Sequence, residues 1–387
     1  MSTILVHAGR AFTPTTEIPD AAILIRDGVI ESVGPRSGAT LPAGAEEIVA
    51  KDTIAAPGFL DIHIHGAGGH DVMEASDDAL KTVARTVAAH GTTSLVATTV
   101  TASTDSICRA AEGIGQYIAR QHQAEDRRAE ILGIHFEGPF ISSVRRGVHS
   151  PEFLRLPSAE LLEQFIHAAK GNAQILTLAP ELLGAMPCIN AARTSGRGVA
   201  LGHTDATYEQ ARAAFAHGAR HAVHVYNAMR PFSHRDSGVI GAVLTTPEVT
   251  AELIADGVHV DETAMRLLLQ AKGATGVILV SDGTAATGMP DGKYTLGTFE
   301  VTVSGGISRN AEGKLAGSTL TLDRALRNVV NLGIPVADAL RMLTLNPATL
   351  LGLEFKKGAL RCGADADILL LDQALNLTQV WTRGFTN

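Results

Sequence analysis

The sequence predicts an α/β fold, a (β/α)8 TIM barrel with a small β-sandwich domain formed from the N- and C-terminal segments. Two observations support this prediction. Eight short β-rich runs alternate with helical stretches through the middle of the chain, whereas both ends carry strand patterns without helices between them. The length of 387 residues exceeds that of an average single domain and suits a barrel with an accessory domain.

The two ends of the chain have strand patterns that we expect to form one domain. Three β-rich runs near the N-terminus, two of them joined by the turn signal Asp27-Gly28, are followed by two comparable runs near the C-terminus. These runs are residues 3–6, 21–25, 29–33, 366–371 and 379–381. We therefore expect a composite β-sandwich domain of residues 1–54 and 355–387, with the barrel in residues 55–354.

The central segment supplies the expected barrel. Its eight strands are residues 59–65, 93–100, 131–137, 175–179, 198–203, 222–226, 252–256 and 277–282. Helix-forming residues with apolar positions three and four apart lie between them, and these predict helices. The clearest such segments are residues 77–90, 104–122, 159–170, 208–217 and 262–272. Active sites of this fold lie at the carboxyl ends of the strands, so those ends are the place to look for function.

Composition excludes several classes of protein. A formal net charge of −8 argues against nucleic acid or an anionic membrane as the main partner, because either would require a basic face. The chain has no apolar run of about 18 residues and no signal-peptide pattern at its start, so we expect a cytoplasmic protein. Its three cysteines, Cys108, Cys188 and Cys362, are widely separated and are expected to be reduced packing residues.

Two histidines two residues apart, His63 and His65, end the first expected barrel strand and precede a glycine-rich turn. Residues i and i+2 of a strand share a face, so both imidazoles point the same way. This arrangement is typical of metal ligands, although an isolated His-x-His pair is as often a pair of hydrogen-bonded core histidines.

Further ionisable residues come at the ends of other expected strands. Glu137 ends the third strand, His203 the fifth and Asp282 the eighth, while His224 and Asn227 belong to the sixth. A lone histidine is more often a core residue than a ligand. The joint occurrence of these side chains on one rim favours a metal site.

The ligand types limit the metal and the chemistry. Nitrogen and oxygen ligands without cysteine suit zinc, iron or another divalent transition ion. An ion held by Glu137, His203 and His224 with an open position would lower the pKa of water, and Asp282 could take the proton and pass it to a leaving amine. For Asp282 a helix N-cap is the simpler alternative. Several metal-dependent barrel hydrolases bridge two ions with a carboxylated lysine on the fourth strand. Residues 174–181, which include that strand here, hold no lysine, so Glu137 must take any bridging role.

Several longer motifs carry a family resemblance. They are Pro-Gly-Phe-Leu-Asp at 57–61, His-Phe-Glu-Gly-Pro-Phe at 135–140, Arg-Gly-Val-His at 146–149, Gly-His-Thr-Asp at 202–205, His-Val-Tyr-Asn-Ala-Met at 224–229, Asp-Gly-Val-His at 256–259 and Leu-Ala-Gly-Ser at 315–318. With these motifs the chain resembles the amidohydrolase superfamily and, within it, the family of N-acetylglucosamine-6-phosphate deacetylases. The resemblance covers nearly the whole chain.

The resemblance implies hydrolysis of N-acetylglucosamine 6-phosphate to glucosamine 6-phosphate and acetate. It implies that Glu137, His203 and His224 are the main metal ligands, that Asp282 is the catalytic acid and base, and that His149 contacts the sugar and polarises its carbonyl. His63 and His65 are also present, so one or two ions, of zinc or iron, are expected. The substrate-binding residues that it implies are Val148, His149, Asn227, Ala228, Arg235, His259, Leu315, Ala316 and Gly317.

In similar proteins the arginine at the position of Arg235 comes from the neighbouring subunit, so the resemblance implies a homodimer. The loop at 235–238, Arg-Asp-Ser-Gly, departs from the usual Arg-Glu-Pro-Gly. On the residues alone, a solvated loop charge explains Arg235 better, and only the resemblance favours phosphate binding. Two other functions remain open, a related metal-dependent amidase for an N-acyl amino acid or cyclic amide, and a non-catalytic assembly module.

Overall fold

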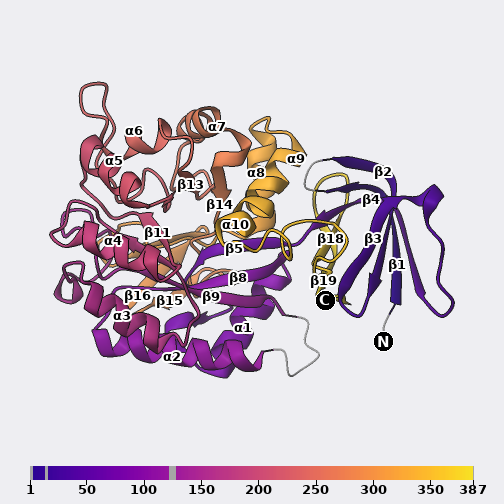
Figure 1. Ribbon diagram of the computed structural model, residues 1–387, viewed down its shortest axis with the longest axis horizontal. Coiled ribbons are helices and arrows are strands. Elements are labelled where there is room, and N and C mark those ends of the chain that lie inside the picture. The colour runs from indigo at the N-terminus through magenta and orange to yellow at the C-terminus, as the bar shows by residue number, and fades with distance from the viewer. Residues whose placement is uncertain (1–2, 14–15, 122–127, 387) are drawn as a thin grey trace.

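A computed structural model describes residues 3–13, 16–121 and 128–386 of the chain. Figure 1 shows a large body of strands and helices beside a smaller β-sheet body that contains both ends of the chain. The two bodies are joined where β4, in the smaller sheet, ends at Pro57 and β5, in the larger one, begins at Phe59. Among the described residues, no helix is long and apolar enough to cross a membrane.

The smaller body is a seven-stranded mixed sheet with the order β20-β19-β18-β4-β1-β2-β3. The strands are β1 Thr3–Phe12, β2 Glu17–Arg26, β3 Val29–Pro35, β4 Glu46–Pro57, β18 Ile368–Leu371, β19 Leu377–Thr382 and β20 Phe385–Thr386. The pairing of β4 with β18 joins the two termini in one sheet. Side chains from both ends, among them Val6, Ile23 and Trp381, pack into one fully buried core. Both ends of the chain therefore contribute to one sheet, in agreement with the predicted fold class.

The larger body is built on eight parallel strands, as the sequence predicts. They are β5 Phe59–Ile64, β8 Thr92–Thr99, β9 Glu130–Glu137, β10 Ala173–Leu178, β11 Gly198–Leu201, β12 His221–Ala222, β13 Thr250–Leu253 and β14 Val277–Leu279. Their order in the sheet follows the chain from β5 to β14. A parallel bridge between Ile64 and Gly283 joins the first strand to the segment after the last, which closes the sheet into a barrel.

Helices cover the outside of the barrel (Figure 1). They are α1 Asp77–Ala88, α2 Thr104–Arg120, α3 Ala159–Ala168, α4 Ala185–Thr194, α5 Tyr208–His217, α6 Gly238–Leu244, α7 Glu262–Gly276, α8 Leu322–Asn331, α9 Val336–Leu343 and α10 Leu345–Leu350. The five predicted helices are all present. Side chains of Ser76, Ser103 and Thr207 accept hydrogen bonds from backbone amides in the first turns of α1, α2 and α5, which explains where these helices begin. The end of the predicted helix at residue 122 lies outside the described residues.

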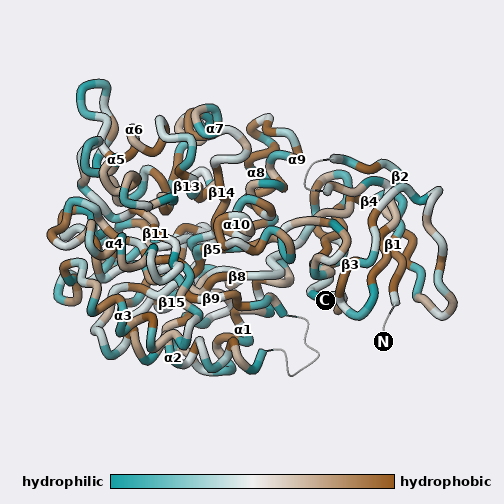
Figure 2. The backbone as a smooth tube through the Cα atoms, in the orientation of Figure 1, coloured by the Kyte–Doolittle hydropathy of each residue, from teal (hydrophilic) through white to brown (hydrophobic). Residues whose placement is uncertain are grey.

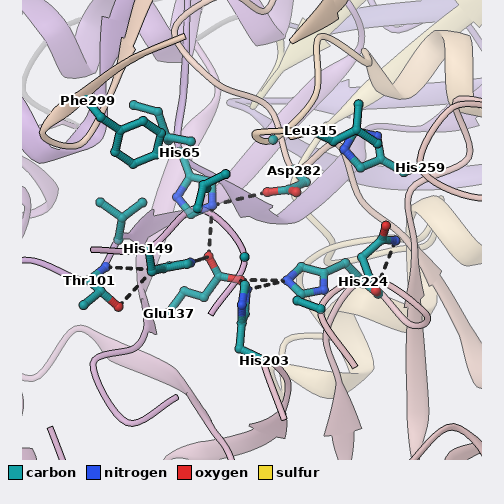
Figure 3. A pocket seen from close by; sticks show the side chains of 17 residues that line it. His65, Thr101, Glu137, His149, His203, His224, His259, Asp282, Phe299 and Leu315 are labelled. Carbon is teal, nitrogen blue, oxygen red and sulfur yellow. Dashed lines mark hydrogen bonds and ion pairs between the residues drawn. The ribbon is translucent and has the colours of Figure 1, made fainter. Parts of the chain in front are cut away.

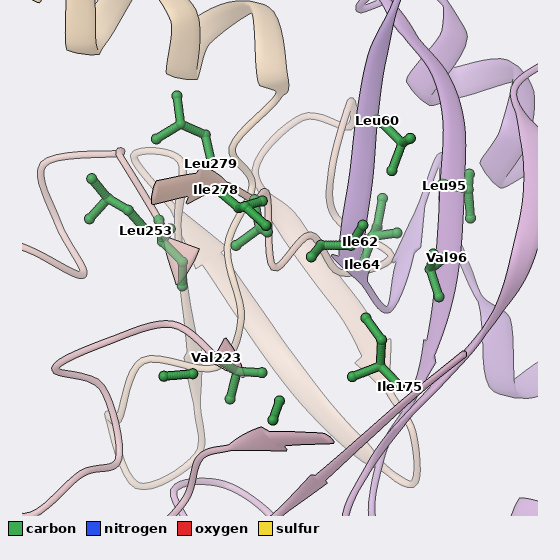
Figure 4. Packing of buried hydrophobic residues seen from close by; sticks show 14 of the residues in the cluster. Leu60, Ile62, Ile64, Leu95, Val96, Ile175, Val223, Leu253, Ile278 and Leu279 are labelled. Carbon is green, nitrogen blue, oxygen red and sulfur yellow. The ribbon is translucent and has the colours of Figure 1, made fainter. Parts of the chain in front are cut away.

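Aliphatic side chains fill the barrel and the layer between its strands and helices. Figure 4 shows Ile62, Ile64 and Val96 from β5 and β8 together with Ile278 of β14 across the barrel. Figure 2 shows hydrophobic residues along the strands and interspersed with hydrophilic ones along the helices. The barrel is therefore a packed core, and the space for a ligand lies at its rim.

Several barrel strands end earlier than the sequence predicts, and three of them end just before an expected site residue. The structure ends β11 at Leu201, β12 at Ala222 and β14 at Leu279. The cause is the backbone of the residues that follow, because His203, His224 and Asp282 have φ angles of 46°, 26° and 49°. This left-handed conformation is incompatible with a continuing strand, and for residues other than glycine it is concentrated at functional sites.

A three-stranded antiparallel sheet follows β14 and is absent from the sequence-based prediction. It consists of β15 Gly292–Leu296, β16 Phe299–Ser304 and β17 Ile307–Asn310. A second small element, the hairpin of β6 Gly66–Ala67 and β7 His70–Asp71, follows the first barrel strand. The carboxylate of Asp71 accepts a hydrogen bond of 2.7 Å from the backbone N–H of Gly297, so the two insertions are joined at the rim. Short 3-10 helices occur at Arg36–Gly38, Val72–Glu74 and Pro151–Phe153.

A buried ion cluster lies where the smaller sheet meets the start of β9. The ammonium of Lys357 is 2.6 Å from Glu130, 2.8 Å from Asp365 and 2.9 Å from Asp367. Burial alone would lower the pKa of Lys357, but the carboxylates of Asp367, Glu130 and Asp365 raise it above its ordinary value. The lysine is therefore charged and holds three carboxylates together.

Replacing Lys357 with methionine should lower the free energy of unfolding by about 3–5 kcal/mol, because buried carboxylates would lose their counter-charge. The change can be measured as the midpoint of urea denaturation. Lys356→Met is the matched control, since Lys356 is exposed and should change the midpoint little. Equal midpoints for the two variants would show that the cluster contributes no net stability.

Candidate active site

A cavity of about 240 Å³ opens at the carboxyl ends of the barrel strands. Figure 3 shows histidine and carboxylate side chains converging in it from several strand ends. Most of the predicted site residues line it, namely His65, Glu137, Val148, His149, His203, His224, Asn227, Ala228, His259, Asp282, Leu315 and Gly317. His63 is fully buried directly behind this lining and contacts Glu137. The barrel thus brings together residues that are far apart in the sequence.

Glu137, His203 and His224 form a compact triangle of ligand atoms. The Oε1 atom of Glu137 is 3.2 Å from His203 Nε2 and 2.9 Å from His224 Nε2, and the two imidazole nitrogens are 3.1 Å apart. Ligand atoms held about 2.0–2.1 Å from a tetrahedral zinc ion lie roughly 3.3 Å from one another. The three separations therefore fit one divalent ion.

A second group of donors shares Glu137. His65 Nε2 lies 3.2 Å from Glu137 Oε2 and 3.2 Å from Asp282 Oδ1. His63 Nε2 lies 3.3 Å from Glu137 Oε1 and 3.7 Å from Asp282 Oδ1. Oε1 of Glu137 thus contacts His63 as well as His203 and His224, and Oε2 contacts His65, so both groups of donors share this one carboxylate.

Hydrogen bonds on the far side of each ring decide which histidines can act as ligands. Nδ1 of His65 contacts the carbonyl oxygen of Thr98 at 2.9 Å, and Nδ1 of His203 contacts that of Arg145 at 3.1 Å. A carbonyl only accepts, so in the neutral form of each ring Nδ1 carries the proton and Nε2 presents its lone pair to the site. In His63 the hydrogen-bond acceptor for Nδ1 is the carboxylate of Glu252, at 2.7 Å.

Nε2 of His63 is also a buried nitrogen that forms no hydrogen bond within the described part of the chain. Such an atom is costly unless an additional partner binds it. A cation between His63, His65, Glu137 and Asp282 would satisfy it. The residues present therefore fit a divalent metal.

His149 has the opposite tautomer. Its Nδ1 accepts a hydrogen bond of 3.2 Å from the backbone N–H of Thr101, and the hydroxyl of Thr101 is 2.9 Å from the same atom. The proton of a neutral His149 must then be on Nε2, which faces the cavity 3.6 Å from Glu137. His149 is thus suited to donate a hydrogen bond to a bound molecule rather than to bind a metal.

The carboxylates of the site are held in their charged form. Burial alone would raise the pKa of Glu137, but the surrounding His63, His149 and His203 lower it well below its ordinary value. Burial would likewise raise the pKa of Asp282, and His65 and His63 lower it. Both groups are ionised at neutral pH, so Glu137 can bind a cation and Asp282 can accept a proton.

Asp282 is placed by its backbone. Its N–H donates to the carbonyl of His63 at 2.9 Å, and its own carbonyl accepts from the N–H of Ser318 at 2.7 Å. These bonds fix its left-handed conformation and direct its carboxylate into the cavity, where Figure 3 shows it beside His65.

Glu252 is a site residue that the sequence analysis missed. It is fully buried in β13, where its carboxylate contacts His63 at 2.7 Å and His221 at 2.9 Å and accepts the backbone N–H of His224 at 3.0 Å. It therefore orients one candidate ligand directly and another through the main chain. The signal for it was an acidic residue in a predicted barrel strand, away from the carboxyl end where site residues were sought. Val100, Thr101, Leu296 and Phe299 also line the cavity and were not predicted.

Two predicted substrate-binding residues do not line the cavity. Ala316 is fully buried behind it, and Arg235 lies in an exposed loop before α6. Figure 3 shows His259 on the far side of Asp282 from His149. Asn227 also lines the cavity, and its amide lies 3.4 Å from the carbonyl oxygen of His224. Nδ1 of His259 is 2.7 Å from Asp256, which leaves Nε2 as the ring atom available to a bound group.

Comparisons with known proteins place the chain in a family. The sequence pattern of the Amidohydrolase family matches residues 54–385. The chain belongs to the amidohydrolase family. This membership agrees with the barrel and with the histidine and carboxylate cluster at its rim. The matched segment includes all the strands from which the site is built.

Amidohydrolases with similar sequences include the N-acetylgalactosamine-6-phosphate deacetylase of Escherichia coli O157:H7, which is 38% identical over 99% of this chain and 98% of its own length. The N-acetylglucosamine-6-phosphate deacetylase of Vibrio furnissii is 38% identical over 94% of this chain and 90% of its own length. Among solved structures, the N-acetyl-D-glucosamine-6-phosphate deacetylase of Mycobacterium smegmatis, an aspartate-to-alanine mutant in complex with N-acetyl-D-glucosamine-6-phosphate, is similar with a TM-score of 0.92. It is 35% identical, over 100% of this chain and 99% of that one.

Proposed function

We propose that this amidohydrolase cleaves the acetamide of N-acetylglucosamine 6-phosphate, giving glucosamine 6-phosphate and acetate. The observation that supports the proposal most strongly is the triangle of Glu137, His203 and His224 beside Asp282, in a cavity that Asn227 and His259 also line. The names of the similar deacetylases supply the substrate class.

Glu137, His203 and His224 would hold one divalent ion, and His63 and His65 with Asp282 offer a second position. Their nitrogen and oxygen donors suit zinc or iron. When bound, such an ion supplies a Lewis acid that polarises the acyl oxygen and lowers the pKa of water. Glu252, Thr98 and Arg145 accept from Nδ1 of His63, His65 and His203, so the neutral form of each ring would offer Nε2 to the ion.

The chain's own residues move the protons. His149 donates Nε2–H to the carbonyl oxygen of the acetamide and stabilises the negative charge that develops there. Asp282 takes a proton from the attacking water and then gives it to the amide nitrogen as the C–N bond breaks. The amine leaves with that proton, and the water oxygen remains in acetate. No further donor of electrons or protons is needed.

The phosphate would lie at the Asn227 and His259 end of the cavity. Because Arg235 is exposed and lies outside the cavity of its own chain, we propose that it reaches the corresponding cavity of a second copy in a homodimer. A guanidinium offers two parallel donors to a phosphate group, which suits this role.

Arg235→Ala should raise KM for the phosphorylated substrate by about 10- to 100-fold, because a hydrogen bond to a charged group contributes about 1.5–3 kcal/mol. KM for unphosphorylated N-acetylglucosamine should change little. Steady-state kinetics on both substrates measures this. His234→Ala is the control for disturbance of the loop, and equal effects of Arg235→Ala on the two substrates would contradict phosphate binding.

One relative favours a second candidate substrate, N-acetylgalactosamine 6-phosphate, since that name belongs to a protein 38% identical to this one. The proposal is tested by comparing kcat/KM of the metal-loaded protein for the two sugar phosphates and for N-acyl amino acids and cyclic amides. The highest value for N-acetylglucosamine 6-phosphate is expected. A higher kcat/KM for N-acetylgalactosamine 6-phosphate, for an N-acyl amino acid or for a cyclic amide would identify that compound as the substrate instead. No turnover of any of these compounds would indicate a non-catalytic module.

A further inference from the structure

One side of the cavity is apolar. It is formed by Val100, Val148, Leu296 and Phe299, which we call the apolar wall. Val100 follows β8, Leu296 ends β15 and Phe299 begins β16, so the inserted three-stranded sheet contributes half of the wall. None of these side chains carries a hydrogen-bonding group, whereas Glu137, His203 and Asp282 beside them are all charged or polar.

The apolar wall is held in place from behind. Val100 and Leu296 pack in a small buried cluster with Val301 and Ala316, and Phe299 and Val148 pack against that cluster. The turn between β15 and β16 is held by the 2.7 Å hydrogen bond from the N–H of Gly297 to Asp71, a residue that is itself 2% exposed.

Gly297 shows how closely this turn approaches the barrel. Its φ angle is +57°, and a Cβ added there would lie 2.4 Å from Val100 Cγ2. Any other residue would therefore force the turn away from Val100. The apolar wall is a fixed surface, and its distance from the reactive groups is set by backbone packing.

The position of His149 relates this wall to the substrate. In Figure 3, Phe299 and His149 lie on one side of the cavity, and His259 lies on the other side of Asp282. Under the proposed function, the carbonyl oxygen points toward His149 Nε2 and the sugar extends to the phosphate end at Asn227 and His259. The remaining substituent of the carbonyl carbon is the acyl chain, and the side left for it is the apolar wall.

We propose that the apolar wall receives the acyl chain of the substrate and that Leu296 and Phe299 restrict it to short acyl groups. This inference rests on the proposed function and extends it to acyl selectivity. The methyl of an acetyl group gains apolar contact there, while each added methylene must displace a side chain that is fixed from behind.

The test compares kcat/KM of the metal-loaded protein for N-acetyl-, N-propionyl- and N-butyryl-glucosamine 6-phosphate. The wild type should prefer acetyl to butyryl. Phe299→Ala and Leu296→Ala should each lower this preference by about tenfold or more, the scale on which methylene-sized contacts discriminate substrates. Because the preference is a ratio within one preparation, partial loss of folded protein cancels from it.

Val301→Ala is the matched control. Val301 is fully buried in the same cluster but does not line the cavity, so its truncation loosens the insertion without removing wall atoms. An equal fall in preference for Val301→Ala would overturn the proposal, as would no preference in the wild type, or an unchanged preference in the two wall variants. In these cases acetyl turnover remains and the proposed function stands. No turnover of any acyl derivative by the wild type would overturn both.

Discussion

Replacing Asp282 with asparagine is expected to reduce kcat by about 10²- to 10⁴-fold while the protein keeps its bound metal. The amide has the size of the carboxylate but cannot accept a proton from water. The backbone bonds to His63 and Ser318 that place residue 282 do not involve the side chain, so the loop should keep its conformation. Steady-state rates and elemental analysis of the purified variant measure the two quantities.

Asp282 also lies 3.2 Å from His65, within reach of the second cation position. Loss of metal together with activity would therefore make Asp282 chiefly a ligand. Turnover near the wild-type rate would remove it from proton transfer altogether. If the variant keeps one ion of two and only a trace of activity, the result would fit Asp282 both as a ligand and as a base. The pH profile of the residual rate would then separate the two roles.

Glu137→Gln is expected to remove bound metal and to lower activity below detection. Glu137 is the carboxylate that contacts His203, His224, His63 and His65, all within 3.3 Å. A neutral amide would place an NH₂ group among ring nitrogens and would supply no negative charge for a cation. Metal content after dialysis is the direct measurement.

A second measurement does not depend on turnover. Adding zinc at about 100 times its dissociation constant should stabilise the metal-free wild type by about 2.7 kcal/mol, seen as a higher melting temperature. Glu137→Gln should show no such increase. Glu112→Gln is the control for the same chemical change, because Glu112 is exposed on α2. Within the described part of the chain, the only charged group that its carboxylate contacts is Lys170. A normal zinc response in Glu137→Gln would exclude the proposed ligand role.

The barrel could be predicted because its strands repeat with a regular spacing, and the order of parallel strands follows from that repetition alone. The strand ends were harder to place. His203, His224 and Asp282 turn into the left-handed region, and this depends on hydrogen bonds to segments far away in the chain, such as that of Asp282 with Ser318. No local pattern encodes those partners.

Residues with ligand chemistry were recognisable as histidines and carboxylates near strand ends, whereas the groups that orient them were not. Glu252 lies within a strand, and its contact with His63 joins positions 189 residues apart. Thr98 and Arg145 act through backbone carbonyls, which carry no sequence signal. The inserted sheet of β15 to β17 was missed because its strands are short and lie where the barrel repeat has already ended.

The smaller sheet has a consequence for biosynthesis. Its first four strands are complete at Pro57, but their partner β18 begins only at Ile368, about 310 residues later. At about 5–20 residues per second, translation leaves the edge of β4 without its neighbour for roughly 15–60 s. During that interval the nascent N-terminal strands expose an apolar face to the ribosome's surroundings, which makes them a natural target for chaperones, and a chain truncated before Ile368 would keep that face uncovered permanently.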